Sequence, residues 1–250
     1  MTDPLEIAIH AARAAGKLLR ENFGTKLDVD AFEAHDIKLD LDVRAQNLIT
    51  EILLGAFPSH AIYGEEGIAG NQQSEQQWIV DPIDGTVNFF YGIPHFCISI
   101  ALRERGEILL GVIYDPMRDE LWQVRAGETP LLNGAPISAS KRTQLGDCMV
   151  SVGFAKSKTT IDSGLPLFEK LVYRVRKCRM MGSAALDMAY VASGRLDAYI
   201  EQVVSLWDVA AGKILIESAG GRVEMKPRED KPDKFSIVAS SGLVDFLAVS

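Results

Sequence analysis

The chain has 250 residues, of which 47% are hydrophobic and 24% charged, a composition typical of a folded globular protein rather than a disordered one. Its net charge is −8 and no run of lysine or arginine exceeds two residues, which argues against a nucleic-acid partner. The three cysteines fit no zinc or CxxC spacing and are expected to be reduced thiols. We see no secretion signal and no apolar stretch approaching the ~20 residues that span a membrane, so we expect a cytoplasmic protein without a membrane partner.

Helices are predicted from apolar residues at helical spacing and from signals at the helix ends. Asp3 is expected to cap the first helix, with Pro4 in its first turn, and Gly24 ends it. Pro58 ends the second helix, and Gly194 follows the fourth. The predicted helices cover residues 4–23, 42–57, 165–177, 183–193 and 206–219, and a short further helix is expected at the C-terminus.

Strands are predicted where short apolar runs are bounded by turn residues or by acids. The predicted strands cover residues 61–63, 78–80, 95–102, 108–114, 120–124, 198–201 and 235–239. Strands and helices in blocks predict a layered α/β fold with layers alternating α-β-α-β-α. We expect a mixed α+β N-terminal part over residues 1–140 and an α/β C-terminal part over residues 141–250, with the functional site where the two parts meet.

The densest chemical signal lies in residues 78–89, Trp-Ile-Val-Asp-Pro-Ile-Asp-Gly-Thr-Val-Asn-Phe. An apolar strand delivers Asp81, Pro82 is expected to turn the chain, and Asp84 follows close enough for both carboxylates to meet one cation or two adjacent ones. Hard oxygen ligands favour Mg²⁺, Mn²⁺ or Ca²⁺ over zinc. The amides of Gly85 and Thr86, at the start of a possible helix, could bind phosphate. A plain turn explains an isolated Asp-Gly, but it does not explain two acids at the end of a buried strand.

Two further acidic segments give weaker signals when each is taken alone. Glu65, in Tyr-Gly-Glu-Glu-Gly at residues 63–67, follows a short strand, where a solvated acidic loop is the simpler interpretation. Asp208 falls in the first turn of a predicted helix, where a carboxylate could simply interact favourably with the helix dipole.

These segments, in this order, resemble the inositol monophosphatase family, within the wider lithium-sensitive phosphatase superfamily. Residues 78–89 resemble the first signature of that family and residues 207–221 its second, while residues 64–66 and 182–199 match further elements. The resemblance extends from about residue 5 to residue 239, nearly the whole chain. It implies the layered sugar-phosphatase fold, a Mg²⁺-dependent phosphatase and a homodimer.

The resemblance also implies roles for individual residues. Two or three Mg²⁺ ions would be ligated by Glu65, Asp81, Asp84, Asp208 and the carbonyl of Ile83. The amides of Gly85 and Thr86 would hold the phosphate, and the catalytic residues would be Glu65, Thr86 and Asp42, of which Thr86 and Asp42 orient the attacking water. The substrate would be bound by Asp84, Gly182, Ser183, Ala184 and Glu201.

The activity that we expect is hydrolysis of inositol 1-phosphate or a similar small polyol or sugar phosphate by metal-activated water, without a covalent intermediate. Glu201 favours a polyol, because a carboxylate accepts hydrogen bonds from hydroxyl groups. Alternatives in the same class are a fructose-1,6-bisphosphatase, a histidinol-phosphatase and a 3′-phosphoadenosine 5′-phosphate phosphatase. The alternative of another class is a regulatory protein-binding module, since some bacterial relatives bind transcription or ribosome-assembly machinery.

The sequence departs from the family before Asp42, where residues 36–41 replace the usual Val-Thr pair. In relatives this loop carries a lysine toward a metal site, and the sequence leaves open whether Lys38 has that role. Trp78 and Trp207 are expected to pack rather than to bind substrate, and the basic residues 174–177 to form a solvated helix face. The histidines match no ligand pattern and are expected to be structural or at the surface: His10, His35, His60 and His95.

Overall fold

The computed structural model describes residues 2–25, 29–33, 36–154, 158–228 and 231–248. The helices of this part are α1 (Pro4–Asn22), α2 (Asp40–Ala56), α3 (Thr86–Phe90), α4 (Lys158–Arg174), α5 (Ala184–Ala192) and α6 (Leu206–Ser218), with a 3₁₀ turn at Leu145–Asp147. The strands are β1 (Val29–Glu33), β2 (Asp36–Leu39), β3 (Ala61–Gly64), β4 (Gly67–Gly70), β5 (Gln76–Asp84), β6 (Cys97–Glu104), β7 (Glu107–Asp115), β8 (Glu120–Arg125), β9 (Leu131–Leu132), β10 (Ala135–Pro136), β11 (Met149–Val152), β12 (Lys177–Arg179), β13 (Ala198–Ser205), β14 (Arg222–Arg228) and β15 (Lys231–Ser240).

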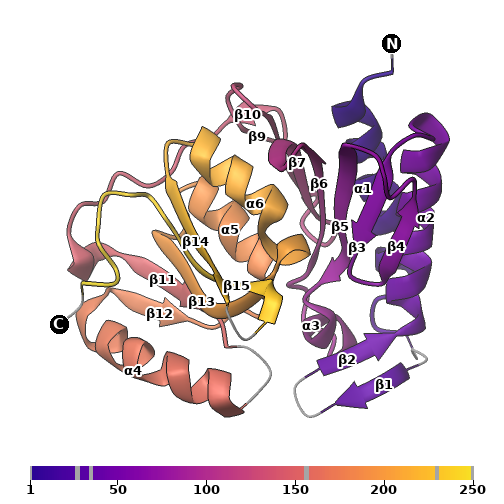
Figure 1. The fold of residues 1–250 in the computed structure, drawn as a ribbon. Helices are drawn as coiled ribbons and strands as arrows, with labels where there is room; N and C mark the ends of the chain where they lie inside the picture. The colour runs from indigo at the N-terminus through magenta and orange to yellow at the C-terminus, as the bar shows by residue number, and fades with distance from the viewer. Residues whose placement is uncertain (1, 26–28, 34–35, 155–157, 229–230, 249–250) are drawn as a thin grey trace.

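The first large sheet has eight strands in the order β10-β9-β8-β7-β6-β5-β3-β4, and α1 and α2 cover one of its faces (Figure 1). The helix α1 begins where predicted, because the carboxylate of Asp3 accepts the amide of Leu5 at 2.9 Å. Its apolar face of leucine and alanine packs with α2 against the buried Trp78 and Val112 of the sheet. This packing closes the first hydrophobic core and confirms Trp78 as a packing residue.

The second large sheet has five strands in the order β12-β11-β13-β15-β14. The helices α5 and α6 lie between the two sheets, and α4 lies on the outer side of the second sheet (Figure 1). Gly111 of β7 permits this close packing, because a Cβ there would come within 2.8 Å of the carbonyl oxygen of Ala211 in α6. The α-β-α-β-α layering is therefore confirmed, whereas the division of the chain at residue 140 stays a prediction.

Two predicted helix starts are wrong. The helix α2 begins at Asp40 rather than at residue 42, because Asp42 acts as a capping side chain and accepts the amide of Leu39 at 2.8 Å. The helix α4 begins at Lys158 rather than at residue 165, so Pro166 lies inside it. A proline usually marks a helix start or a break, and here the helix continues through it.

The predicted C-terminal helix is also wrong, since residues 241–248 contain no helix. Side chains there accept nearby amides in turns instead, as Asp245 does from Leu247 at 2.9 Å. Several strands were not predicted because they are short or carry many polar residues; they are β1, β2, β4, β9, β10, β11, β12 and β14. His35 and the side chain of Lys38, for which we considered a structural role and a role at a metal site, lie outside the described residues.

Candidate active site

Glu65 and Asp81 are brought together by two parallel strands. The strand β3 runs parallel to β5, with Gly64 opposite Val80. Just past the end of β3, the amide of Glu65 donates to the carbonyl of Val80 at 3.1 Å. Because Asp81 directly follows Val80, the two acids that the sequence separates by sixteen positions stand on neighbouring chain segments.

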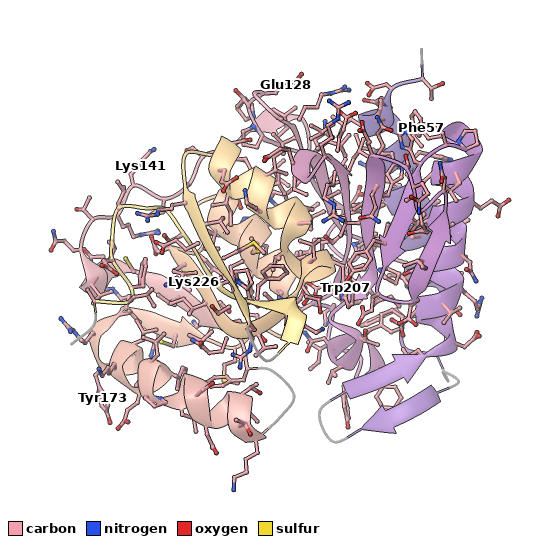
Figure 2. All side chains as sticks on the ribbon, viewed as in Figure 1. Phe57, Glu128, Lys141, Tyr173, Trp207 and Lys226 are labelled. Atoms are coloured by element: carbon pink, nitrogen blue, oxygen red, sulfur yellow. The ribbon has the colours of Figure 1, made fainter. Side chains whose placement is uncertain are left out.

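Asp208 reaches the same place from the start of α6, the helix that follows β13 and lies between the two sheets. Ser99 of β6 lies opposite Asp81, and its hydroxyl donates to the carbonyl of Trp207 at 3.3 Å. Trp207 directly precedes Asp208 at the start of α6. Figure 2 shows Trp207 at the junction between the two halves of the molecule, with its ring centroid 5.5 Å from that of Tyr63.

The segment from Asp81 to Asp84 is a bulge in the strand, which corrects our expectation that Pro82 ends it. The strand β5 continues to Asp84, but Pro82 and Ile83 together stand opposite the single residue Ile98 of β6. In a regular strand, residues three apart face opposite sides of the sheet. The extra residue corrects the alternation, so both carboxylates face the same side.

Asp84 binds the N-terminus of α5, where the predicted substrate-binding residues lie. Its Oδ2 accepts the hydroxyl of Ser183 and the amide of Ala185, each at 2.6 Å, and its Oδ1 accepts the amide of Ala184 at 3.3 Å. Gly182, just before this turn, has a φ of 80°, a conformation that suits glycine. One carboxylate therefore joins the bulge of β5 to the start of the middle helical layer.

Thr86 is the first residue of α3, and its hydroxyl lies between two oxygen acceptors. The Oγ1 atom is 2.9 Å from the carbonyl oxygen of Ile83 and 3.3 Å from Oδ1 of Asp42. The hydroxyl has a single proton, so it donates to one of these acceptors at a time. The preceding residue, Gly85, has a φ of 102°, and a Cβ there would meet the carbonyl oxygen of His95 at 3.0 Å.

The carboxylates form a concentrated patch of negative charge. Asp81 is 1% exposed, and burial raises its pKa well above the ordinary value. The nearby carboxylates of Glu65, Asp84, Asp208 and Asp42 raise the pKa of Asp81 further. Such a carboxyl regains its negative charge most easily when a cation lies beside it, so the residues present fit a divalent cation.

These side chains form a loose cluster rather than a closed cage. Within the described ranges, no group of three or more histidine, cysteine or acidic side chains is arranged to hold a metal ion by itself. Part of the reason is that Asp84 binds the start of α5, while Asp208 accepts the amide of Ser205 at 2.6 Å. A loose oxygen cluster suits Mg²⁺, which keeps several water ligands and is often held by one or two carboxylates together with phosphate.

A cavity of about 580 Å³ opens over this cluster. The predicted site residues that line it are Glu65, Asp81, Ile83, Asp84, Gly85, Thr86, Gly182, Ser183, Ala184, Glu201 and Asp208. Asp42 is not part of the lining and contacts the site through Thr86. The structure thus brings every predicted site residue to one place, and their roles stay predictions.

Glu201 lies on the second-sheet side of the cavity, in β13. Its Oε2 accepts the hydroxyl of Tyr199, and burial raises the pKa of that tyrosine well above its ordinary value, so the phenol remains a donor. Gly153 makes room for this carboxylate, because a Cβ at residue 153 would come within 1.7 Å of Oε2. Neither Tyr199 nor Gly153 was predicted.

Asp187 in α5 also lines the cavity and was not predicted. Its Oδ2 accepts the hydroxyl of Ser151 at 2.6 Å, while its Oδ1 is buried without a hydrogen-bond partner. The Nε2 atom of His95 is likewise buried without a partner, 4.0 Å from Oδ1 of Asp187. Burial and the charge of Arg118 lower the pKa of His95 to about 4, so the imidazole is neutral at pH 7, and its structural role stays a prediction.

Comparison with known proteins finds relatives that match nearly the whole chain. The inositol monophosphatase family profile matches residues 1–245. The Nus factor SuhB of Escherichia coli strain K12 is 38% identical over 224 residues, which are 88% of this chain and 84% of that protein.

No helix among residues placed by the structure is long and apolar enough to cross a membrane.

Solved structures share the fold over nearly their whole length. The extragenic suppressor protein suhB from Bartonella henselae matches with a TM-score of 0.88 and 33% identity, covering 95% of this chain and 93% of that one. The inositol monophosphatase from Anabaena (Nostoc) sp. PCC 7120 matches with a TM-score of 0.83 and 37% identity, covering 96% and 90% of the two chains.

Proposed function

The chain belongs to the inositol monophosphatase family, and from that premise we propose that it is a Mg²⁺-dependent phosphomonoesterase acting on inositol 1-phosphate or a similar small polyol or sugar phosphate. The observation that carries the proposal is the buried Asp81 within a cluster of carboxylates on the wall of a 580 Å³ cavity. Burying such a cluster without a cation costs free energy on folding. In a phosphatase, the cation would take part in catalysis.

We propose that Glu65, Asp81, Asp84, Asp208 and the carbonyl of Ile83 hold the ions. Bound Mg²⁺ would neutralise charge on the phosphate and lower the pKa of the attacking water. We expect two or three ions in each active site.

The remaining steps fall to the side chains around Thr86. We propose that its hydroxyl orients the attacking water and that Asp42, 3.3 Å away, holds that hydroxyl. Glu65 acts with them as the third catalytic residue. The amides at Gly85 and Thr86, at the start of α3, bind the phosphate oxygens, and water attacks directly because no side chain is needed as a nucleophile.

The polyol part of the substrate would bind at the other side of the cavity. Glu201 accepts hydrogen bonds from substrate hydroxyls, while Gly182, Ser183 and Ala184 line the pocket beside Asp84. A fructose-1,6-bisphosphatase, a histidinol-phosphatase and a 3′-phosphoadenosine 5′-phosphate phosphatase are the competing activities at the same site. We further propose a cytoplasmic homodimer, a state that light scattering on the purified protein measures.

The deciding experiment is phosphate release with and without Mg²⁺ from myo-inositol 1-phosphate, fructose 1,6-bisphosphate, histidinol phosphate and 3′-phosphoadenosine 5′-phosphate. We expect release that requires Mg²⁺ and falls about a hundredfold or more in Asp84→Asn. The matched control is Asp147→Asn, an exposed acid in the 3₁₀ turn that does not line the cavity. Release without Mg²⁺, or equal loss in both variants, would contradict the proposed mechanism.

A second candidate function, a regulatory protein-binding module, is favoured by the name of the 38% identical relative, Nus factor SuhB. A protein that only binds a partner has no need for clustered buried acids, so we place this function beside catalysis rather than in its place. Calorimetry with Mg²⁺ separates the two: a chain that binds no Mg²⁺ would favour the module alone.

A further inference from the structure

The cavity has an uneven distribution of charge. Its acidic lining residues are Glu65, Asp81, Asp84, Asp187, Glu201 and Asp208. Among the described lining residues, the single cationic side chain is Lys234. The proposed mechanism gives that lysine no role, although it lies within the substrate cavity.

Lys234 is held firmly at the second-sheet side of the cavity. It stands in β15 directly opposite Ser205 of β13, and its ammonium donates to the hydroxyl of Ser205. The Nζ atom also lies 5.1 Å from the centroid of the Trp207 ring, an attractive cation–π arrangement. Trp207, which we expected only to pack, therefore also positions a charge.

The described contacts of Lys234 leave part of its binding capacity unused. An ammonium has three N–H donors and no acceptor, and the hydroxyl of Ser205 takes one of them. Its other described contact is an aromatic face rather than a carboxylate. A positioned cation with spare donors in a substrate cavity is suited to bind an anionic oxygen.

The scissile phosphate is expected elsewhere in the same cavity. The amides that would bind it lie at the start of α3, beside the first sheet, whereas Lys234 belongs to the second sheet. We propose that Lys234 binds a second anionic group of the substrate, a phosphate or a carboxylate, and so favours sugar or polyol phosphates that carry a second anionic group over inositol 1-phosphate. This inference rests on the proposed phosphatase function and, among the activities considered for this site, favours those whose substrates carry two anionic groups.

The test compares substrates that differ by one anionic group. Fructose 1,6-bisphosphate is paired with fructose 1-phosphate, and 3-phosphoglycerate with glycerol 3-phosphate, and the measured quantity is the ratio of kcat/KM within each pair. We expect Lys234→Met to lower the ratio about tenfold in at least one pair, as for loss of a charge-assisted hydrogen bond. A fall in the fructose pair identifies a second phosphate, and a fall in the glycerate pair identifies a carboxylate.

Two further variants control the charge and the fold. Lys234→Arg keeps the positive charge and the hydrogen-bond donors, and should recover most of the ratio. Lys226→Met removes an exposed lysine of the adjacent strand β14, labelled in Figure 2. Lys226 does not line the cavity, so this variant should leave the ratio at the wild-type value. An unchanged ratio in Lys234→Met for both pairs, or an equal fall in Lys226→Met, would overturn the inference.

A binding measurement keeps the test independent of turnover. Calorimetric affinities of the same four compounds, with Ca²⁺ replacing Mg²⁺, give the same ratios without hydrolysis. If the wild type releases no phosphate, the proposed function fails while these affinity ratios still decide the role of Lys234. A wild type that binds each doubly anionic compound no more tightly than its partner would refute that role.

Discussion

Replacing Asp81 by asparagine tests how much the buried Asp81 carboxyl destabilises the folded protein when no cation is bound. Burial and the neighbouring carboxylates raise the pKa of Asp81 well above its ordinary value. A carboxyl that takes up a proton on folding at pH 7 costs about 1.4 kcal/mol for each pH unit above its unfolded pKa of about 3.9. Complete protonation of Asp81 in the absence of a cation therefore costs about 4 kcal/mol, an upper limit that relaxation and water entry reduce.

We expect Asp81→Asn to be more stable than the wild type by about 1 to 3 kcal/mol in EDTA at pH 7. An amide carries no charge to neutralise, and its oxygen can still accept the amide of Ile83, now 3.0 Å from Oδ1 of Asp81. Because the folded-state pKa is raised, the folded protein binds more protons than the unfolded chain above about pH 4. The destabilisation of the wild type by Asp81 is absent below about pH 4 and grows as the pH rises. The difference in unfolding free energy between Asp81→Asn and the wild type should therefore shrink toward pH 4.

Urea unfolding followed by circular dichroism measures these differences, in EDTA and in excess Mg²⁺. A cation that binds only the folded state stabilises the wild type, and it should stabilise Asp81→Asn less. The matched control is Asp115→Asn. Asp115 is also buried, but its carboxylate forms an ion pair with the guanidinium of Arg118 at 2.8 Å, so the same change there should destabilise the protein. An Asp81→Asn variant less stable than the wild type in EDTA at pH 7 would refute the reasoning.

Two other predictions concern residues around the site. The pKa of His95 is lowered to about 4 by burial and Arg118, so the stability due to the neutral imidazole is complete above about pH 6.5 and is lost as the pH falls through 4. Between pH 7 and pH 4.5 the wild type should lose about 2 kcal/mol more than His95→Gln in urea unfolding, and parallel pH profiles would exclude His95 as the source. Gly64→Ala would place a Cβ 2.1 Å from Oε1 of Gln46 and break its hydrogen bonds to the loop after Glu65, a loss of about 2 kcal/mol. Gly55→Ala is the control, because that position in α2 has nothing within 4 Å, and an equal loss there would disprove the steric argument.

The elements that were predicted best have their determinants close together in the sequence. The helix α1 has its cap at Asp3, its proline and its apolar repeat within one segment, and it begins as predicted. The strand β14 carries arginine, glutamate, lysine and proline along an edge of its sheet, so local pattern gave no signal for it. The position of β14 depends on its pairing with β15. The residues of β14 alone do not indicate that pairing.

The same distinction holds for the site. The acids that a compact motif or a resemblance singled out, such as Asp84 and Glu201, do line one cavity. Lys234 was missed because its partner Ser205 lies far away in the sequence and a single lysine in a strand gives no signal. Asp187 could have been found, since it lies one helical turn after Ser183 and therefore on the same face of α5.

The number of residues between Asp81 and Asp84 limits how the length of this segment can vary among homologous chains. A chain one residue shorter there would pair β5 with β6 without interruption and would still point both acids to one side. The carbonyl of Ile83, however, would return to the regular hydrogen-bond ladder and no longer accept Thr86. We therefore expect homologous chains to keep the number of residues between the two acids, because a deletion would remove the free carbonyl that accepts the hydroxyl of Thr86.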